Sequence, residues 1–168
     1  MQKDELTQLL YDRHAEFSAF LLELSEEQFE GQPDKWNAGQ QLSHIQRSVM
    51  PLLKAFSLPK WVIRLLFGKS ETGSRSYEEV VTAYQGQLSE GGKAPSAYLP
   101  SDIPFDGLER GTRWLAKATR RLNRLVLGYS EKELDTLRLP HPILGKITLR
   151  EMLYFTAYHV QHHQKQIK

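Results

Sequence analysis

Apolar residues recur along the chain at the three- and four-residue spacing of an amphipathic helix, and no segment shows the alternation typical of a half-buried strand. In the first such segment, for example, Leu6, Leu10, Phe17 and Leu21 fall on one side of a helix. The spacing predicts four long helices, near residues 4–24, 37–56, 106–127 and 148–166.

Two shorter helices are predicted between the second and third long ones. PKWVIRLLFGKS, residues 59–70, has the pattern of a short apolar helix, and SYEEVVTAYQGQL, residues 76–88, has that of an amphipathic one. The glycines and prolines of residues 90–104 predict a loop after them. A second loop is predicted for LPHPILGKI, residues 139–147, because its prolines and glycine do not fit a regular helix.

Signals for helix starts support these boundaries. A capping box pairs a Ser, Thr, Asn or Asp cap with a Glu or Gln three residues later. Such pairs are Asn37 with Gln40, Ser76 with Glu79, Asp106 with Glu109, and Thr148 with Glu151. Pro51 lies inside the second long helix and predicts a kink or an early end there, because proline lacks the backbone N–H that a helix needs.

A weak internal similarity suggests how the helices are organised. LLELSEEQF, residues 21–29, resembles LVLGYSEKEL, residues 125–134, and each joins the end of a long helix to a capped turn. We therefore expect an all-α fold in a single domain, residues 1–168. Its core would be a four-helix bundle of two related helix pairs, with a short helical insertion between helices 2 and 3.

Composition narrows the class of protein. There is no cysteine among the 168 residues, which excludes disulfides and thiolate ligands, and the net charge of +2 gives little reason to expect nucleic acid. No apolar run approaches the length of a membrane span. The segment MQKDELTQLLYDRHAEF is charged and amphipathic, unlike a signal peptide. We expect a soluble cytoplasmic protein with no membrane partner.

Three histidines fall close together in AYHVQHHQKQIK, residues 157–168. At about 100° per residue, His159 and His163 share the apolar side of the last helix, whereas His162 is expected to face solvent. Imidazoles four residues apart on a helix can share one divalent ion. The alternative is a polar helix end. Buried neutral imidazoles need some partner, and no acidic residue lies near them in this helix.

A third ligand would have to come from elsewhere. His44 lies at the margin of the apolar face of the second helix and is either a ligand or a hydrogen-bonded core histidine. His14, at the edge of the first helix's stripe, is a candidate pocket residue. His141, between two prolines, is expected to support a loop.

These residues also carry a resemblance. WNAGQQLSHI and LPHPILGKITLREMLYFTAYHVQHHQKQI contain a W-x-x-x-Q-x-x-x-H segment and a late Y-H-x-x-x-H. Both resemble the DinB-like superfamily, also called the YfiT-like metal-dependent hydrolases, over most of the chain. The resemblance implies a four-helix bundle, commonly a homodimer. It also implies a divalent metal ion, often nickel or zinc, bound at the positions that match here, His44, His159 and His163.

The resemblance extends to activity more loosely. Some relatives are thiol S-transferases that use bacillithiol or mycothiol, and one branch isomerises maleylpyruvate. Three histidine ligands leave a coordination position open, where a metal lowers the pKa of a bound water or thiol. We therefore expect a metal-dependent transferase or hydrolase that acts on a small-molecule substrate, with a low-molecular-weight thiol or metal-bound water as nucleophile.

Three polar residues near the expected ligands are candidates either for supporting those ligands or for contacting substrate: Gln41, Ser48 and Tyr158. For Gln41 and Ser48 the alternative is the ordinary polarity of a helix face, and for Tyr158 it is surface packing. The sequence has no apparent Ser-His-Asp arrangement or phosphate-binding loop.

Two alternatives to an enzyme remain: a bundle that binds metal without turnover, and a binding module. The second rests on basic residues that share one side of the third long helix, namely Arg110, Arg113, Lys117, Arg120, Arg121 and Arg124. Such a face is more often solvated and paired with acidic residues from elsewhere. No aromatic residue alternates with the arginines as a base-stacking surface requires, so nucleic acid is not the expected partner.

Overall fold

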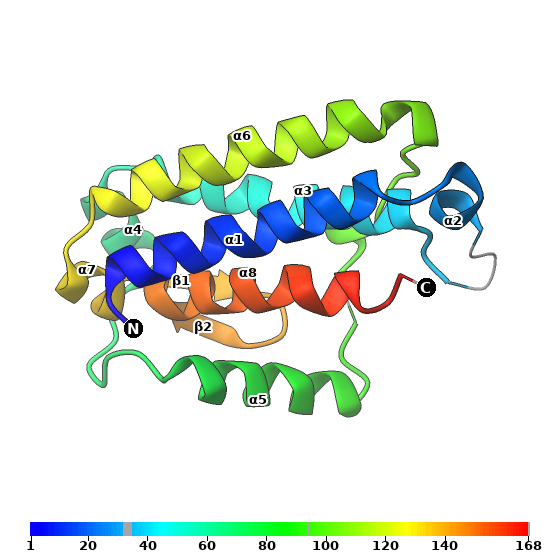
Figure 1. Ribbon diagram of the computed structural model, residues 1–168. Helices are drawn as coiled ribbons and strands as arrows, with labels where there is room; N and C mark the ends of the chain where they lie inside the picture. The colour runs from blue at the N-terminus through cyan, green and yellow to red at the C-terminus, as the bar shows by residue number, and fades with distance from the viewer. Residues whose placement is uncertain (32–34, 94, 168) are drawn as a thin grey trace.

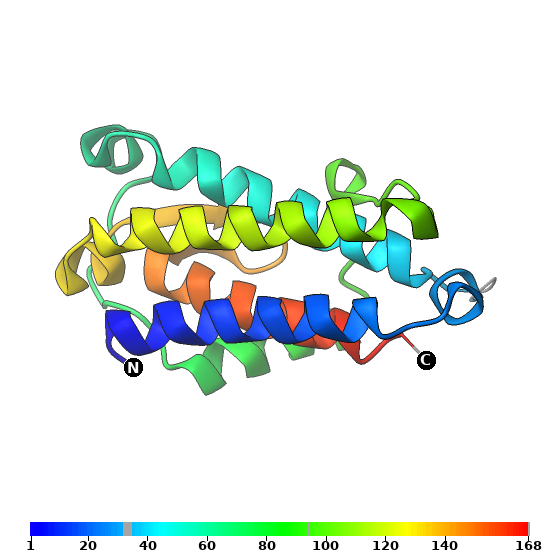
Figure 2. The ribbon, with the colours of Figure 1, turned by 45° about the horizontal axis from the view of Figure 1, so that its top comes forward.

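The computed structural model describes residues 1–31, 35–93 and 95–167. Four long helices run along the length of the molecule in both views of the ribbon (Figure 1 and Figure 2). They are α1 (Lys3–Leu22), α3 (Ala38–Phe56), α6 (Leu108–Leu127) and α8 (Leu149–Gln164). Helices α1 and α3 each pack against both α6 and α8. The predicted four-helix bundle is therefore confirmed.

The core forms where the apolar faces of these helices meet. Leu6, Leu10 and Phe17 of α1 and Leu115 of α6 are fully buried there. Burial of one such side chain stabilises the fold by about 1.5 to 3 kcal/mol relative to exposure. Helix α8 is the most enclosed element, because α1 and α3 cover it within the bundle and α5 packs on it from outside.

The expected insertion lies between α3 and α6 and consists of α4 (Lys60–Phe67) and α5 (Tyr77–Ser89). The capping box of α5 is present, with Ser76 accepting from the backbone N–H of Glu79. Figure 1 shows α5 lying alongside α8, on the side away from α6. This helix adds a fifth element against one side of the bundle.

The short helices α2 (Glu26–Glu30) and α7 (Glu131–Thr136) follow α1 and α6. Ser25 caps the first and Ser130 caps the second, each through a complete capping box. The two capped turns suggested by the internal similarity are therefore both present.

A two-stranded hairpin replaces the loop predicted for residues 139–147. Strand β1 (Arg138–His141) pairs in antiparallel register with β2 (Gly145–Thr148). Gly145 has φ +72°, a conformation that glycine adopts without strain, at the end of the turn. Leu139 lies opposite Ile147, and both are buried. The loop prediction is wrong because this apolar pair packs into the core.

Helix α3 continues through Pro51 to Phe56, so the early end, one of the two predicted effects of this proline, is wrong, and the kink stays a prediction. Proline at this position leaves the carbonyl group of Arg47 without its helical hydrogen bond. Both residues are exposed, so water can satisfy that carbonyl group.

The capping box predicted at Asp106 is absent. The 3₁₀ turn η2 (Phe105–Gly107) leads into α6, and the cap residue Gly107 provides no side-chain hydrogen bond. Phe105 instead packs edge to face on Phe29, with ring centroids 5.7 Å apart. Aromatic packing therefore accompanies the entry into this helix in place of a polar cap.

In the described part of the chain, no helix combines the length and the apolar character that crossing a membrane requires.

Candidate metal centre

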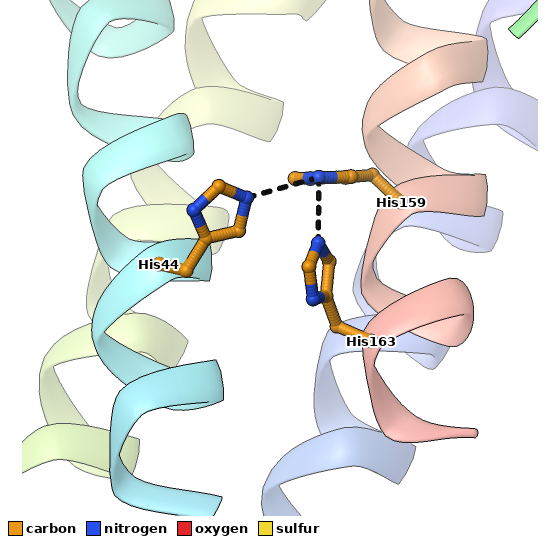
Figure 3. A group of neighbouring side chains, drawn as sticks. All are labelled: His44, His159 and His163. Carbon is orange, nitrogen blue, oxygen red and sulfur yellow. Dashed lines mark hydrogen bonds between the residues drawn. The ribbon is translucent and has the colours of Figure 1, made fainter. Parts of the chain in front are cut away.

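Three histidine rings from two helices converge in the interior of the bundle (Figure 3). His44 comes from α3, and His159 and His163 come from α8, one turn apart. Nε2 of His159 lies 3.2 Å from Nε2 of His44 and 2.9 Å from Nε2 of His163. All three side chains are buried. The structure brings together the three residues that the helical pattern and the family resemblance indicated as metal ligands.

The surrounding protein holds the outer nitrogens of two of these rings. Nδ1 of His44 donates to the carbonyl oxygen of Tyr98, 2.7 Å away, and Nδ1 of His163 donates to Oε1 of Gln41, 2.5 Å away. The amide nitrogen of Gln41 in turn donates to the carbonyl oxygen of Trp36. Histidines that bind metals usually have such a partner, which fixes the tautomer and the direction of the ring.

These hydrogen bonds leave the inner nitrogens of His44 and His163 as lone-pair acceptors. Both lone pairs point toward Nε2 of His159, which carries at most one hydrogen when neutral. One hydrogen cannot fully satisfy two acceptors. A cation bound by all three nitrogens removes the conflict, and donors about 2.1 Å from one ion at tetrahedral or octahedral angles stand about 3.0 to 3.4 Å apart. The two spacings to His159 are close to this range, and the three ligand nitrogens all lie within 4.8 Å of one another, so the cluster could hold a divalent ion.

Burial keeps the three rings neutral. Desolvation, followed by the charge of neighbouring histidines, holds the pKa of His159 and of His163 well below the usual value of 6.5. Burial also lowers the pKa of His44, although its bond to the Tyr98 carbonyl opposes the shift. Neutral imidazole is the form that binds metal, so little proton release is required at neutral pH.

Aromatic rings flank the cluster on both sides. Trp36 stacks on His163, with centroids 6.1 Å apart and planes 12° apart. Phe155, one turn before His159 on α8, stacks on that ring at 4.7 Å and 29°. The sequence pattern contained Trp36 without assigning it a role, and it did not single out Phe155. Spacing by four on one helix is the signal that could have found Phe155.

A cavity of about 500 Å³ lies beside the three rings. Its wall comes from α3, the end of α4, α5, α8, the hairpin and the segment near Tyr98. Tyr84 of α5 lines it, and sequence reasoning missed this residue because nothing in its own segment indicates that α5 packs on α8. His141 lines it as well. Nδ1 of His141 also accepts from the backbone amides of Ile143 and Leu144, so it supports the turn as expected.

The prediction that His162 faces solvent is wrong. The residue is half-buried and lines the cavity, and its ring centroid lies 6.0 Å from that of Tyr84. Its Nε2 accepts a hydrogen bond from the amide of Gln166, 2.7 Å away. The side of α8 that a plain four-helix bundle would leave exposed is covered here by α5.

His14 is a core histidine rather than part of the cavity wall. Only 3% of its surface is exposed, and Nδ1 donates to the carbonyl oxygen of Leu10 at 2.7 Å. Burial lowers its pKa to about 4, so the ring is neutral at pH 7.

The three candidate substrate contacts lie in different places. Gln41 is buried and holds His163, as described above. Ser48 lines the cavity, and its hydroxyl donates to the carbonyl oxygen of His44. The Tyr158 hydroxyl accepts from the amide of Gln85 on α5, and Tyr158 is not among the described residues that line the cavity. Contact with substrate stays a prediction for all three.

The sequence also matches a known protein family. A family model described as the DinB superfamily matches residues 4–167, nearly the whole chain. No curated protein matches significantly. No solved structure matches significantly either.

Proposed function

Because the chain belongs to the DinB superfamily, we propose that it is a metal-dependent transferase or hydrolase in which His44, His159 and His163 bind one divalent ion. The observation that carries this proposal is the convergence of two fixed lone pairs on Nε2 of His159, beside a cavity large enough for a small molecule. Zinc and nickel are the proposed ions, since imidazole suits both.

The bound ion would lower the pKa of a thiol or water bound to it, which would then serve as the nucleophile at neutral pH. The chain's own residues orient and enclose that centre. The Tyr98 carbonyl and the Gln41 amide hold two rings in one tautomer, so that their lone pairs face inward. Because all three rings are buried in the bundle, bulk water has restricted access to them. A substrate would therefore enter from the cavity side.

Metal binding is the first test. Protein purified without nickel resin or chelator is titrated with Zn²⁺ and Ni²⁺, and one equivalent should bind with high affinity. Replacement of His44 or His163 by Ala should abolish tight binding while the helical circular dichroism signal persists. The matched control is His14→Gln, which should keep one equivalent because His14 lies outside the cluster. No binding of either ion to the unmutated protein would exclude the proposal.

Catalysis needs a separate test. The metal-loaded protein is assayed for transfer of a thiol to 1-chloro-2,4-dinitrobenzene and for hydrolysis of p-nitrophenyl esters, with metal-free protein as the control. Turnover that requires the metal supports the enzyme. Stoichiometric metal binding without turnover across a broad panel of thiols and esters would favour the non-catalytic metal-binding bundle. The homodimer stays a prediction, which sedimentation equilibrium tests.

One observation favours a second candidate function. All six basic residues of the α6 face are exposed, and in the described residues only Arg113 makes an ion pair, with Glu109 on the same helix. The expected pairing with acidic residues from elsewhere is therefore not seen in the described part of the chain. A free basic face is suited to a polyanion. Binding of heparin that weakens steeply with salt and is lost in Arg120→Glu would support this function.

A further inference from the structure

The cavity beside the three histidines has a polar end and an apolar end. From His44 its wall follows α3 toward the carboxyl end of that helix, and from His159 it follows α8 back toward Met152. The ring nitrogens lie at the polar end. The apolar end is formed by Pro51, Leu52, Ala55, Phe67, Leu139 and Met152.

The wall is also electrically neutral. Among the residues that the structure describes, no Asp, Glu, Lys or Arg lines this cavity. A charged group that enters an apolar space without a partner loses its hydration and gains little in return. A ligand that carries a carboxylate or an ammonium group at the apolar end would therefore bind poorly. An anionic head group at the polar end would not have this problem, since the proposed metal ion would balance it.

Two neutral hydrogen-bond donors interrupt the apolar surface. The hydroxyl group of Tyr84 has no hydrogen-bond partner among the described residues, although only 5% of the residue's surface is exposed. Because Nδ1 of His141 accepts from two backbone amides, its proton resides on Nε2, which is left to donate. The rings of Tyr84 and His141 lie 6.3 Å apart. Both side chains suit an uncharged acceptor on a ligand, such as a carbonyl or ether oxygen.

We propose that this cavity binds a predominantly apolar small molecule whose single metal-binding head group reaches the histidines and whose remaining body is uncharged. The inference rests on the proposed metal site for the head group only. For the reaction this means that, if a thiol is the cosubstrate, the charged parts of that thiol lie outside the apolar end of the cavity.

The test uses two thiols that differ only at the carbon remote from sulfur. 1-Hexanethiol ends in a methyl group, and 6-mercaptohexanoate ends in a carboxylate. Binding to the Co²⁺-loaded protein is followed by the absorption band that appears when a thiolate joins cobalt. 1-Hexanethiol should bind at least about tenfold more tightly, because its far end needs no counter-charge. Equal or tighter binding of the carboxylated thiol would overturn the proposal.

A matched pair of variants locates the effect. Phe67 lies at the apolar end, outside the metal centre, and is half-buried. Phe67→Lys places a cation there and should shift the ratio of the two affinities at least about tenfold toward 6-mercaptohexanoate. Phe67→Met, which has similar size and no charge, should leave the ratio near its original value. An unchanged ratio in Phe67→Lys would show that the thiols do not occupy this end, against the proposal.

The cavity proposal can fail or succeed independently of the metal. In metal-free protein, the uncharged fluorophore prodan should bind with a blue-shifted emission. 1-Hexanethiol should displace it at a concentration at least about tenfold lower than 6-mercaptohexanoate requires. If the protein binds neither Zn²⁺, Ni²⁺ nor Co²⁺, the proposed function fails and this experiment still decides the ligand class. Absence of prodan binding, or equal displacement by the two thiols, overturns the inference even if metal binds.

Discussion

Oε1 of Gln41 accepts a hydrogen bond from Nδ1 of His163, 2.5 Å away, and so links α3 to the ligand-bearing side of α8. Loss of an outer partner of a metal-binding histidine typically costs 10- to 100-fold in metal affinity. We predict a loss of about that size for Gln41→Leu, measured by competition with a chelating dye. Gln8→Leu, an exposed change on α1, is the control. An unchanged affinity in Gln41→Leu would show that the contact does not position His163.

His162 should be dispensable for metal. Its Nε2 accepts from Gln166, and it is not one of the three rings whose nitrogens converge. His162→Ala should therefore retain one equivalent of bound metal, whereas His159→Ala should retain none, by elemental analysis. Loss of metal from a folded His162→Ala protein would mean that His162 replaces one of the three ligands in solution.

The stability of the metal-free protein should fall in acid, and His14 should contribute. Burial lowers the pKa of His14 from 6.5 to about 4, so the unfolded chain binds its proton first as pH falls. The stability that the neutral ring allows is complete above pH 6.5 and is lost progressively as pH falls toward 4. By pH 5 the free energy of unfolding should have fallen by about 2 kcal/mol from this residue. Urea denaturation at pH 7.5 and 5.0 measures this loss. His14→Gln should reduce the loss by about that amount. An identical pH dependence in the variant would contradict the assignment.

Gly39 should not tolerate a side chain. A Cβ atom at this position would lie 2.0 Å from the carbonyl oxygen of Ile103, and backbone cannot rotate away as a flexible side chain can. Gly39→Ala should destabilise the fold by about 1 to 3 kcal/mol. It should also weaken metal binding, because the displaced segment carries the carbonyl group of Tyr98 that holds His44.

Gly86→Ala is the matched control for that change. Gly86 lies in α5, and a Cβ there meets nothing within 4 Å. Alanine is the better helix former, so this variant should gain about 0.5 to 1 kcal/mol. Thermal denaturation of both variants checks the pair. Equal stability of the two would show that the contact of Gly39 with Ile103 is looser than described.

Local patterns were enough to predict the four long helices and the inward direction of His159 and His163. Helical phase is a local property, so the apolar neighbours of His159 and His163 indicate which way these side chains point. His44 was harder, because phase alone placed it only at the margin of its apolar face. The family resemblance chose between a ligand and a core histidine.

Gln41 was a candidate support for the ligands, but which histidine it holds, and the role of Tyr98, could not be predicted, because each contact joins distant parts of the chain. Tyr98 lies 54 residues from His44, and Gln41 lies 122 residues from His163. The wrong orientation of His162 has a similar origin, since the packing of α5 on α8 is a tertiary contact. The hairpin was not predicted because its prolines and glycine suggest a loop. The apolar pair Leu139 and Ile147 can be recognised only once the register of the two strands is known.

The direct junction of the hairpin with α8 has a consequence for the rotational phase of that helix. Strand β2 ends at Thr148, which is also the cap of α8, so no spare residue separates strand from helix. One residue inserted at this junction would turn the helix by about 100° and carry His159 and His163 off their common target. An insertion in the turn before Gly145 would leave that angle unchanged. The hairpin contributes no proposed ligand, yet its direct connection to α8 fixes the rotation of that helix and so the direction in which His159 and His163 point.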